Sequence, residues 1–375
     1  MLGEPLPNEE KETGMSLDDD NQTFYFDIAL APQFNAEIGK DDAITYYEIK
    51  VTPEMVESQV KAYTQQNGHY EQVDSYQEND VIKGQLVELN ADGSVKEGGI
   101  VVEGATLMPQ YIKDAGQKKL FGKAKKGDVI TFNHAKAYEG NAIEISSLLN
   151  KKKEEVEGID ADFSLTIQDI TRFVESELNQ EVFDRVFGKD AVKDEAGFRA
   201  KVEESLAQSF VPDSDYKFLL DLRAYMMEKV GKLEYAEDLL KRIMKANKPD
   251  AEQDEATFQR SLEELTWHLI QEKLVEKYNI KVEDADVKAM AREATRAQFA
   301  QYGMMNIPDE LLDNYSKDML KKRETVDGLV NRAIETKLTA AVKGDVKLKN
   351  KKVTVDEFNK LFETAEPAKG KKAKK

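Results

Sequence analysis

Hydrophobic and polar positions repeat with different periods in different parts of the chain. Between residues 75 and 173 they tend to alternate, which is typical of strands that bury one face. We predict strands at residues 81–87, 99–102, 128–138 and 162–173. A turn is expected at the Asn-Ala-Asp-Gly sequence of residues 90–93, and one short helix at residues 108–116. This part of the chain is therefore predicted to be a small α+β module.

From residue 175 onward the apolar residues recur every three or four positions, which predicts amphipathic helices. Their apolar stripes begin at Phe198, Leu219, Phe258 and, after Pro308, at Leu312. Asp194 is placed to cap the first of these helices, and the last stripe predicts one very long helix. The helices exceed the average length of about 11–12 residues and are charged outside their stripes, which favours an elongated, open bundle.

Other signals lie nearer the ends of the chain. A helix is predicted to begin at Thr52 and Pro53, because threonine caps a helix and proline suits its first turn. Residues 24–30 are rich in β-formers and predict an extended strand that stops at Pro32. Residues 1–22 carry seven acidic side chains against one lysine, and the last ten residues are rich in lysine. We predict a disordered tail at each end.

The composition narrows the class of protein. The 375 residues are 40% apolar and 34% charged, with a formal net charge of −18. At about 150 residues per domain this length predicts two or three domains, and so acidic a chain repels nucleic acid. Neither a membrane-spanning apolar stretch nor a secretory signal occurs, so we expect a soluble cytoplasmic protein with no membrane contact. The absence of cysteine excludes disulfides and thiolate chemistry.

Sequence templates for catalysis find little support. The three histidines are scattered and lack the spacing of a metal site, so we expect no bound metal. Gly122 and Gly127 have the glycine spacing of a phosphate-binding loop, but Asp128 stands where the lysine should be. A carboxylate there would repel phosphate, so a turn is the better interpretation and no cofactor is expected. No Gly-x-Ser-x-Gly sequence occurs either.

Methionine and aromatic side chains in the charged helices are the candidates for binding. Two interpretations are open: they pack the core of a bundle, or they form an adaptable apolar surface for many partners. Residues 301–308 favour the second, because Gly303 and Pro308 place them in a turn between helices. The candidate binding residues are Met226, Met227, Phe299, Tyr302, Met304, Met305, Ile307 and Leu311.

The order of these parts resembles the trigger factor family of bacterial ribosome-associated chaperones. The resemblance covers residues 24–362, and residues 298–308 are similar to the tip of a helical arm. It is carried by Ala-Leu-Ala-Pro at residues 29–32, Val-Thr-Pro-Glu at 51–54, the α+β insert and the helical C-terminus. The Gly-Phe-Arg-x-Gly loop of the family's ribosome-binding domain does not occur here. We therefore expect a fragment that begins downstream of most of that domain.

The resemblance implies the domain organisation and the partners. It assigns residues 1–22 to the residual end of the ribosome-binding domain and residues 23–50 to a strand linker packing on the helical domain. Residues 51–173 would form an FKBP-like isomerase domain with a leading helix. Residues 174–365 would form a helical chaperone domain, and residues 366–375 a disordered basic tail. The resemblance implies an ATP-independent chaperone that holds nascent or unfolded polypeptides in a helical cradle. The ribosome would be a partner through the missing domain, and a homodimer is left open.

The α+β insert resembles FKBP-type peptidyl-prolyl isomerase domains. Such domains hold proline in an aromatic pocket and lower a rotation barrier of about 18–20 kcal/mol. Here Lys96 and Lys136 stand where that family has aromatic residues, and a charged segment, residues 139–160, replaces the final flap. The resemblance implies weak or absent activity in a pocket lined by Met108, Tyr111, Ile130, Phe132, Tyr138 and Phe163.

Three hypotheses for function follow. The leading one is a holdase for unfolded polypeptides, and the alternative is an active peptidyl-prolyl isomerase that acts on protein substrates. A third is a cell-envelope chaperone of the parvulin-linked kind, which also joins helices to an isomerase. The lack of a signal peptide argues against the third.

Overall fold

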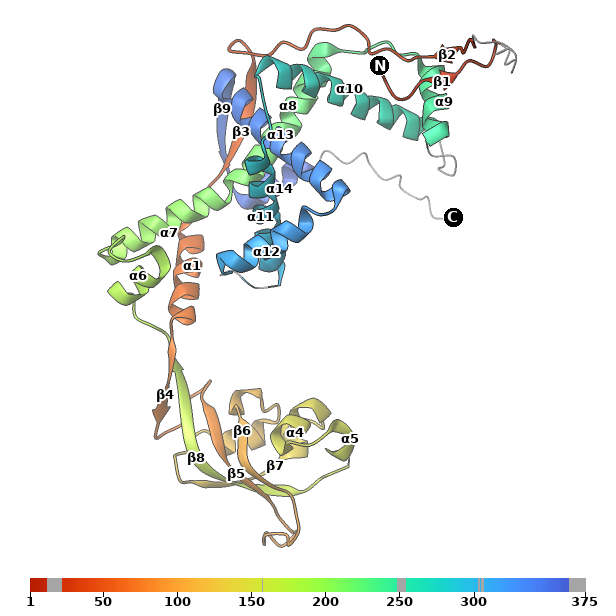
Figure 1. The fold of residues 1–375 in the computed structure, drawn as a ribbon. Helices are drawn as coiled ribbons and strands as arrows, with labels where there is room; N and C mark the ends of the chain where they lie inside the picture. The colour runs from red at the N-terminus through yellow and green to blue at the C-terminus, as the bar shows by residue number, and fades with distance from the viewer. Residues whose placement is uncertain (12–21, 157, 248–253, 303, 305–306, 364–375) are drawn as a thin grey trace, which may run out of the picture. The chain divides into compact units, whose positions relative to one another are not determined.

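The computed structural model describes residues 1–11, 22–156, 158–247, 254–302, 304 and 307–363. The chain divides into two compact units (Figure 1). We call Met1–Lys50 with Ala207–Lys375 the helical unit and Val51–Leu206 the sheet unit. The fold is α+β and multi-domain, as predicted. Within the described ranges, no helix is both long enough and apolar enough to cross a membrane.

An antiparallel sheet with strand order β4-β8-β5-β6 forms the centre of the sheet unit, and β7 also pairs with β8. The strands are β4 (His69–Val73), β5 (Val81–Glu88), β6 (Val101–Leu107), β7 (Val129–Asn133) and β8 (Asp162–Val174). Alternation along β5 and β8 buries Ile82, Leu86 and Leu165 on one face. The predicted α+β module is confirmed.

Local capping changes two predicted elements of the sheet unit. The strand expected at residues 128–138 ends at Asn133, because its side chain accepts a hydrogen bond from the Lys136 N–H (2.8 Å) and caps α3 (His134–Ala137). The single helix expected at residues 108–116 is a 3₁₀ turn, η1 (Pro109–Tyr111), followed by α2 (Ala115–Leu120). Two short helices, α4 (Ala142–Leu149) and α5 (Lys153–Val156), come next along the chain.

Three further helices of the sheet unit share a separate apolar cluster. They are α1 (Pro53–Gln66), α6 (Gln180–Phe187) and α7 (Glu195–Ser209), and Val60 of α1 packs with Phe183 and Phe198. Asp194 caps α7 by accepting the Gly197 N–H at 2.7 Å, as predicted. Because α1 supplies the apolar partner of α6 and α7, α6 and most of α7 group with the sheet unit, which ends at Leu206.

The core of the helical unit lies between α8 (Val211–Val230), α10 (Glu255–Lys277) and α13 (Arg323–Asp345). A parallel two-stranded sheet of β3 (Ala43–Ile49) and β9 (Lys347–Val353) packs against this core. Sequence patterning missed β9 because four of its seven residues are lysine. Only Leu348 and Val353 of that strand point toward apolar neighbours.

The prediction of one very long helix after Pro308 is wrong. α12 (Asp309–Met319) packs on α11 (Asp284–Gln301), whereas α13 contacts α11, α8 and α10. The helix breaks between Met319 and Arg323, and beyond the break α13 gains α8 and α10 as partners in addition to α11. A last helix, α14 (Val355–Glu363), follows β9, and residues 366–375, expected to be a disordered tail, lie outside the described residues.

The first eleven residues pack against the helical unit, which contradicts the predicted tail. Leu2 is buried among side chains of α9 (Glu237–Asn247) and α10. The two-residue strands β1 (Leu6–Pro7) and β2 (Phe26–Asp27) pair, so the strand expected at 24–30 is much shorter. Arg242 of α9 offsets the acidic charge by bonding Asp27 (2.8 Å). Residues 12–21 lie outside the described residues.

Candidate functional site

The α11–α12 hairpin carries most of the predicted binding residues at its tip. The Arg292 guanidinium on α11 bonds the carboxylates of Asp309 (2.6 Å) and Asp313 on α12. The rings of Phe299 and Tyr315 meet edge to face with centroids 5.0 Å apart. An ion-pair cluster and an aromatic pair therefore hold the two helices together; of the connection between them, residues 303, 305 and 306 lie outside the described residues.

Apolar side chains are exposed at this tip. Tyr302 is 77% exposed, Tyr315 52% and Met304 44%. Phe299, Ile307 and Leu311 are half-buried, and Met305 lies outside the described residues. Since charged side chains cover much of both helices, these groups form a small apolar surface in a charged surround. We call Tyr302, Met304 and Tyr315 the tip surface; Tyr315 was not among the predicted binding residues.

Met226 and Met227 do not join the tip surface. Met226 is fully buried in the core of the helical unit with Leu222 and Ile270, so its assignment as a binding residue is wrong. Met227 is half-buried against the same core. Both lie on α8, whose apolar stripe faces α10 and α13, and the core interpretation holds for this pair.

Three of the predicted isomerase-pocket residues belong to the core of the sheet unit. Phe132, Tyr138 and Phe163 are all buried, and the ring of Phe132 lies edge to face against Phe121 at 5.3 Å. Burial raises the pKa of the Tyr138 phenol to about 12. Met108 and Ile130 are half-buried, and Tyr111 is 60% exposed. The structure thus brings the three aromatic residues together as packing groups and leaves Tyr111 at the surface.

Helix α4 contributes to the same core. Its residues Ile145, Leu148 and Leu149 belong to the same core cluster as the three aromatic residues. Asn141 caps the helix by accepting the Ile143 N–H at 3.0 Å. The sequence signal was available in the Ala-Ile-Glu-Ile-Ser-Ser-Leu-Leu run at residues 142–149, but the charges around it made the whole of 139–160 resemble an exposed segment.

A buried histidine lies beside this core. His134 is fully buried, its Nδ1 is 3.1 Å from the Ala161 carbonyl oxygen, and its ring meets Phe163 edge to face. Its Nε2 has no hydrogen-bond partner among the described residues. Burial lowers the pKa of the imidazole, although the Ala161 carbonyl and nearby Asp160 and Glu88 oppose that shift. The ring is therefore a neutral packing group at pH 7.

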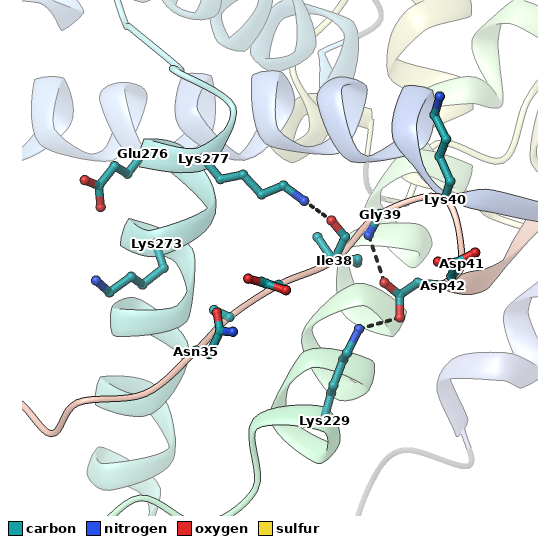
Figure 2. A pocket seen from close by; sticks show the side chains of 12 residues that line it. Asn35, Ile38, Gly39, Lys40, Asp41, Asp42, Lys229, Lys273, Glu276 and Lys277 are labelled. Carbon is teal, nitrogen blue, oxygen red and sulfur yellow. Dashed lines mark hydrogen bonds and ion pairs between the residues drawn. The ribbon is translucent and has the colours of Figure 1, made fainter.

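The helical unit contains a hollow of about 610 Å³ (Figure 2). Residues 35–42 line one side and α8 and α10 the other. Asp42 accepts hydrogen bonds from Lys229 (2.6 Å) and the Gly39 N–H (2.8 Å), and Lys277 bonds the Ile38 carbonyl oxygen. Burial alone would raise the pKa of Asp42, but the hydrogen bonds from Lys229 and Tyr225 outweigh it and lower the pKa. Lys229 and Lys277 therefore anchor the N-terminal segment.

Groups for metal or cofactor chemistry are missing from the described ranges. No cluster of three or more His, Asp or Glu side chains is placed to hold a metal ion in that part of the chain. Gly127 has a positive φ of 88° in a turn, consistent with the interpretation of the glycine pair given above.

Comparison with known proteins gives consistent results. The family model described as "Probable trigger factor, C-terminal domain" matches residues 214–362, and that described as "Probable trigger factor, FKBP-like domain" matches residues 70–175. A relative named Trigger factor, from Chlorobium limicola, is 23% identical over 83% of this chain and 75% of its own length. A solved structure from a study titled "Promiscuous Substrate Recognition in Folding and Assembly Activities of the Trigger Factor Chaperone" is 15% identical. Its TM-score is 0.35, over 83% of this chain and 73% of that one.

Proposed function

This chain belongs to the trigger factor family, and we propose that it is an ATP-independent chaperone that holds unfolded and newly made polypeptides on the tip surface. The single observation that carries the proposal is the exposure of Tyr302, Met304 and Tyr315 on a hairpin whose other contacts are satisfied. Exposed apolar groups rimmed by charge mark interaction sites.

The size of the tip surface favours weak, reversible binding. A Met or Tyr side chain gains at most about 1.5–3 kcal/mol when fully buried, and these three are already partly covered. Association itself costs several kcal/mol. A client segment held by a few such contacts therefore dissociates readily, and no nucleotide is needed to release it.

Methionine and tyrosine suit a surface that accepts many sequences. Methionine has three rotatable bonds and a polarisable sulfur, so its side chain adapts to apolar groups of different shape. Tyrosine adds a large apolar ring with a polar end that tolerates water. The acidic surface of the chain, with a formal net charge of −18, keeps a loaded complex soluble.

The proposed function does not require isomerase activity of the sheet unit. Twisting a prolyl amide requires an open apolar pocket, whereas Phe132, Tyr138 and Phe163 are buried in a core to which α4 also contributes. Tyr111 is at the surface, away from such an enclosure. We expect little or no prolyl isomerisation by this unit.

The remaining partners follow from family membership. We propose the bacterial cytoplasm as the compartment and nascent chains among the clients. Contact with the ribosome would need the family's Gly-Phe-Arg-x-Gly loop, which the 375 residues do not contain, so our proposal for this chain is confined to client binding. Direct nucleic-acid binding is opposed by the acidic charge. A homodimer is compatible with the proposal but is not needed for it.

Suppression of client aggregation tests the proposal. The double variant Tyr302→Ser/Met304→Ser removes roughly 1 kcal/mol of client contact per side chain, because burial in a loose complex is incomplete. We expect about 30-fold weaker binding of a reduced, unfolded globular protein and a matching loss of protection. The control is Val95→Ser/Ile143→Ser, which removes two equally exposed apolar groups from the sheet unit. Equal protection by both variants would refute the role of the tip surface.

A further inference from the structure

Helices α8, α11 and α13 enclose a cleft of about 230 Å³ within the helical unit. Its lining includes Val211, Pro212, Tyr216, Glu293, Arg332 and Glu335. The α8 residues give it an apolar wall, and the other two helices contribute charged groups. The cleft is separate from the tip surface described above, since none of the three tip residues lines it.

Among the described residues that line the cleft, two carboxylates, Glu293 and Glu335, face one cation outside an ion pair, Arg332, which acts on Glu335. Neither Glu293 nor Glu335 forms an ion pair with another residue in the described part of the helical unit. Burial raises the pKa of Glu335, and Arg332 compensates only in part. The third carboxylate, Asp215, is already engaged by Lys343 (2.5 Å) and by the Tyr46 hydroxyl (2.8 Å). The cleft is therefore complementary to a cationic group with an apolar stem.

The chain leaves α14 at the rim of this cleft. Phe362, in the last turn of α14, stacks on Tyr216 with ring centroids 6.3 Å apart and planes inclined by 10°. Tyr216 in turn lines the cleft. The C-terminal segment, residues 364–375, begins two residues after this contact and lies outside the described residues. It contains five lysines and one glutamate, in a chain that is otherwise strongly acidic.

We propose that the C-terminal segment docks in the α8–α11–α13 cleft of its own chain, with its lysines paired to Glu293 and Glu335. Counted from the rim at Phe362, the extended chain reaches at most about 24 Å at Lys369 and about 45 Å at Lys375. Lysine suits the site because its aliphatic stem can lie on Val211 and Tyr216 while the ammonium meets a carboxylate. The proposal is thus one of occupancy, in which the segment fills the cleft of its own chain.

Tethering makes weak contacts sufficient. A segment joined by a short linker experiences an effective concentration in the millimolar range. A peptide that binds the cleft with a Kd near 1 mM would thus already fill about half of the sites when it is attached. The same peptide added in trans would bind only when the attached segment leaves.

Carbodiimide coupling of the full chain is the direct test, and it does not involve clients. The reagent joins a lysine amine to a carboxylate in contact with it. We expect mass spectrometry to find links from Lys369, Lys371, Lys372, Lys374 or Lys375 to Glu293 or Glu335, at least fivefold above links to Glu310. Glu310 is an exposed carboxylate on α12 of the same unit, and it is the matched control. Links spread evenly over exposed carboxylates would overturn the proposal.

A trans-binding experiment tests the competition. A labelled peptide with the sequence of residues 364–375 is titrated into the native chain and into a variant with all five segment lysines replaced by glutamine. We expect at least fivefold tighter binding to the variant, and loss of that binding when Glu293→Gln and Glu335→Gln are added. Equal affinity for the native and lysine-free chains would contradict an occupied cleft. These exposed or half-buried substitutions leave the core intact, which far-UV circular dichroism checks.

Discussion

Replacing Ile145 with alanine tests whether α4 is part of a core or a flap over a pocket. Ile145 is 4% exposed and packs in the core of the sheet unit, whereas Ile143, two residues earlier on the same helix, is 60% exposed. The two residues therefore form a matched pair. Both substitutions change helix propensity equally, by a few tenths of a kcal/mol in favour of alanine.

The expected magnitude follows from the packing. Ile→Ala removes three carbon groups, worth about 2.4 kcal/mol in transfer free energy. A cavity that fails to collapse adds up to about 2 kcal/mol. We expect Ile145→Ala to lower the unfolding free energy of the sheet unit by roughly 2–4 kcal/mol, and Ile143→Ala to change it by less than about 0.5 kcal/mol.

Urea unfolding followed by far-UV circular dichroism and by Trp267 emission separates the two units. Trp267 is the chain's one tryptophan and is buried in the helical unit, so its emission serves as an internal control. Ile145→Ala should lower the midpoint of the sheet unit by roughly 1–2 M urea and leave the tryptophan transition in place. Equal, small effects of the two substitutions would show that α4 is a surface flap and would reopen the isomerase pocket.

Three further predictions concern titration and catalysis. Burial lowers the pKa of His134, so below about pH 6.5 the unfolded state binds more protons than the folded state. The sheet unit should therefore lose stability as pH falls below that value. His134→Gln should make the stability of the sheet unit less dependent on pH in this range. Because the pKa of Asp42 is lowered in the folded state, the stabilisation that its carboxylate gives the helical unit is complete above about pH 4 and is lost as pH falls through the folded-state pKa. Asp42→Asn should lower the unfolding free energy by about 1–3 kcal/mol at pH 7, measured by Trp267 emission. An unchanged unfolding midpoint would contradict the anchoring role. A proline tetrapeptide should be isomerised no faster than in buffer, and turnover that disappears with Tyr111→Ala would refute our interpretation of the buried aromatic residues.

Local signals in the sequence located many of the elements. Thr52 caps α1 with its hydroxyl oxygen 3.4 Å from the Met55 N–H, as threonine followed by proline predicted. Pro308 likewise marks the boundary before α12, which begins at Asp309. These features depend on neighbours within a few residues, so a single sequence carries enough information to place them.

Features that depend on distant partners were missed. β9 has a lysine-rich sequence without strand periodicity, and it forms because β3, some 300 residues earlier, offers a parallel edge. Leu2 is buried only because α9 and α10 present an apolar surface to it. The aromatic residues Phe132, Tyr138 and Phe163 were assigned to a pocket because the resemblance to a family says nothing of what an inserted helix covers. In each case the deciding contact was absent from the local pattern.

Site-specific photo-crosslinking measures client contact at the tip surface most directly. A photoreactive phenylalanine analogue is placed at Tyr302 in one variant and at Tyr70, an equally exposed tyrosine of the sheet unit, in another. Each variant is mixed with a reduced, unfolded globular protein and irradiated. We predict at least tenfold more crosslinked client from position 302 than from position 70, and loss of the product once the client has folded. Equal yields from the two positions, or a yield that is insensitive to client folding, would contradict the proposed chaperone surface.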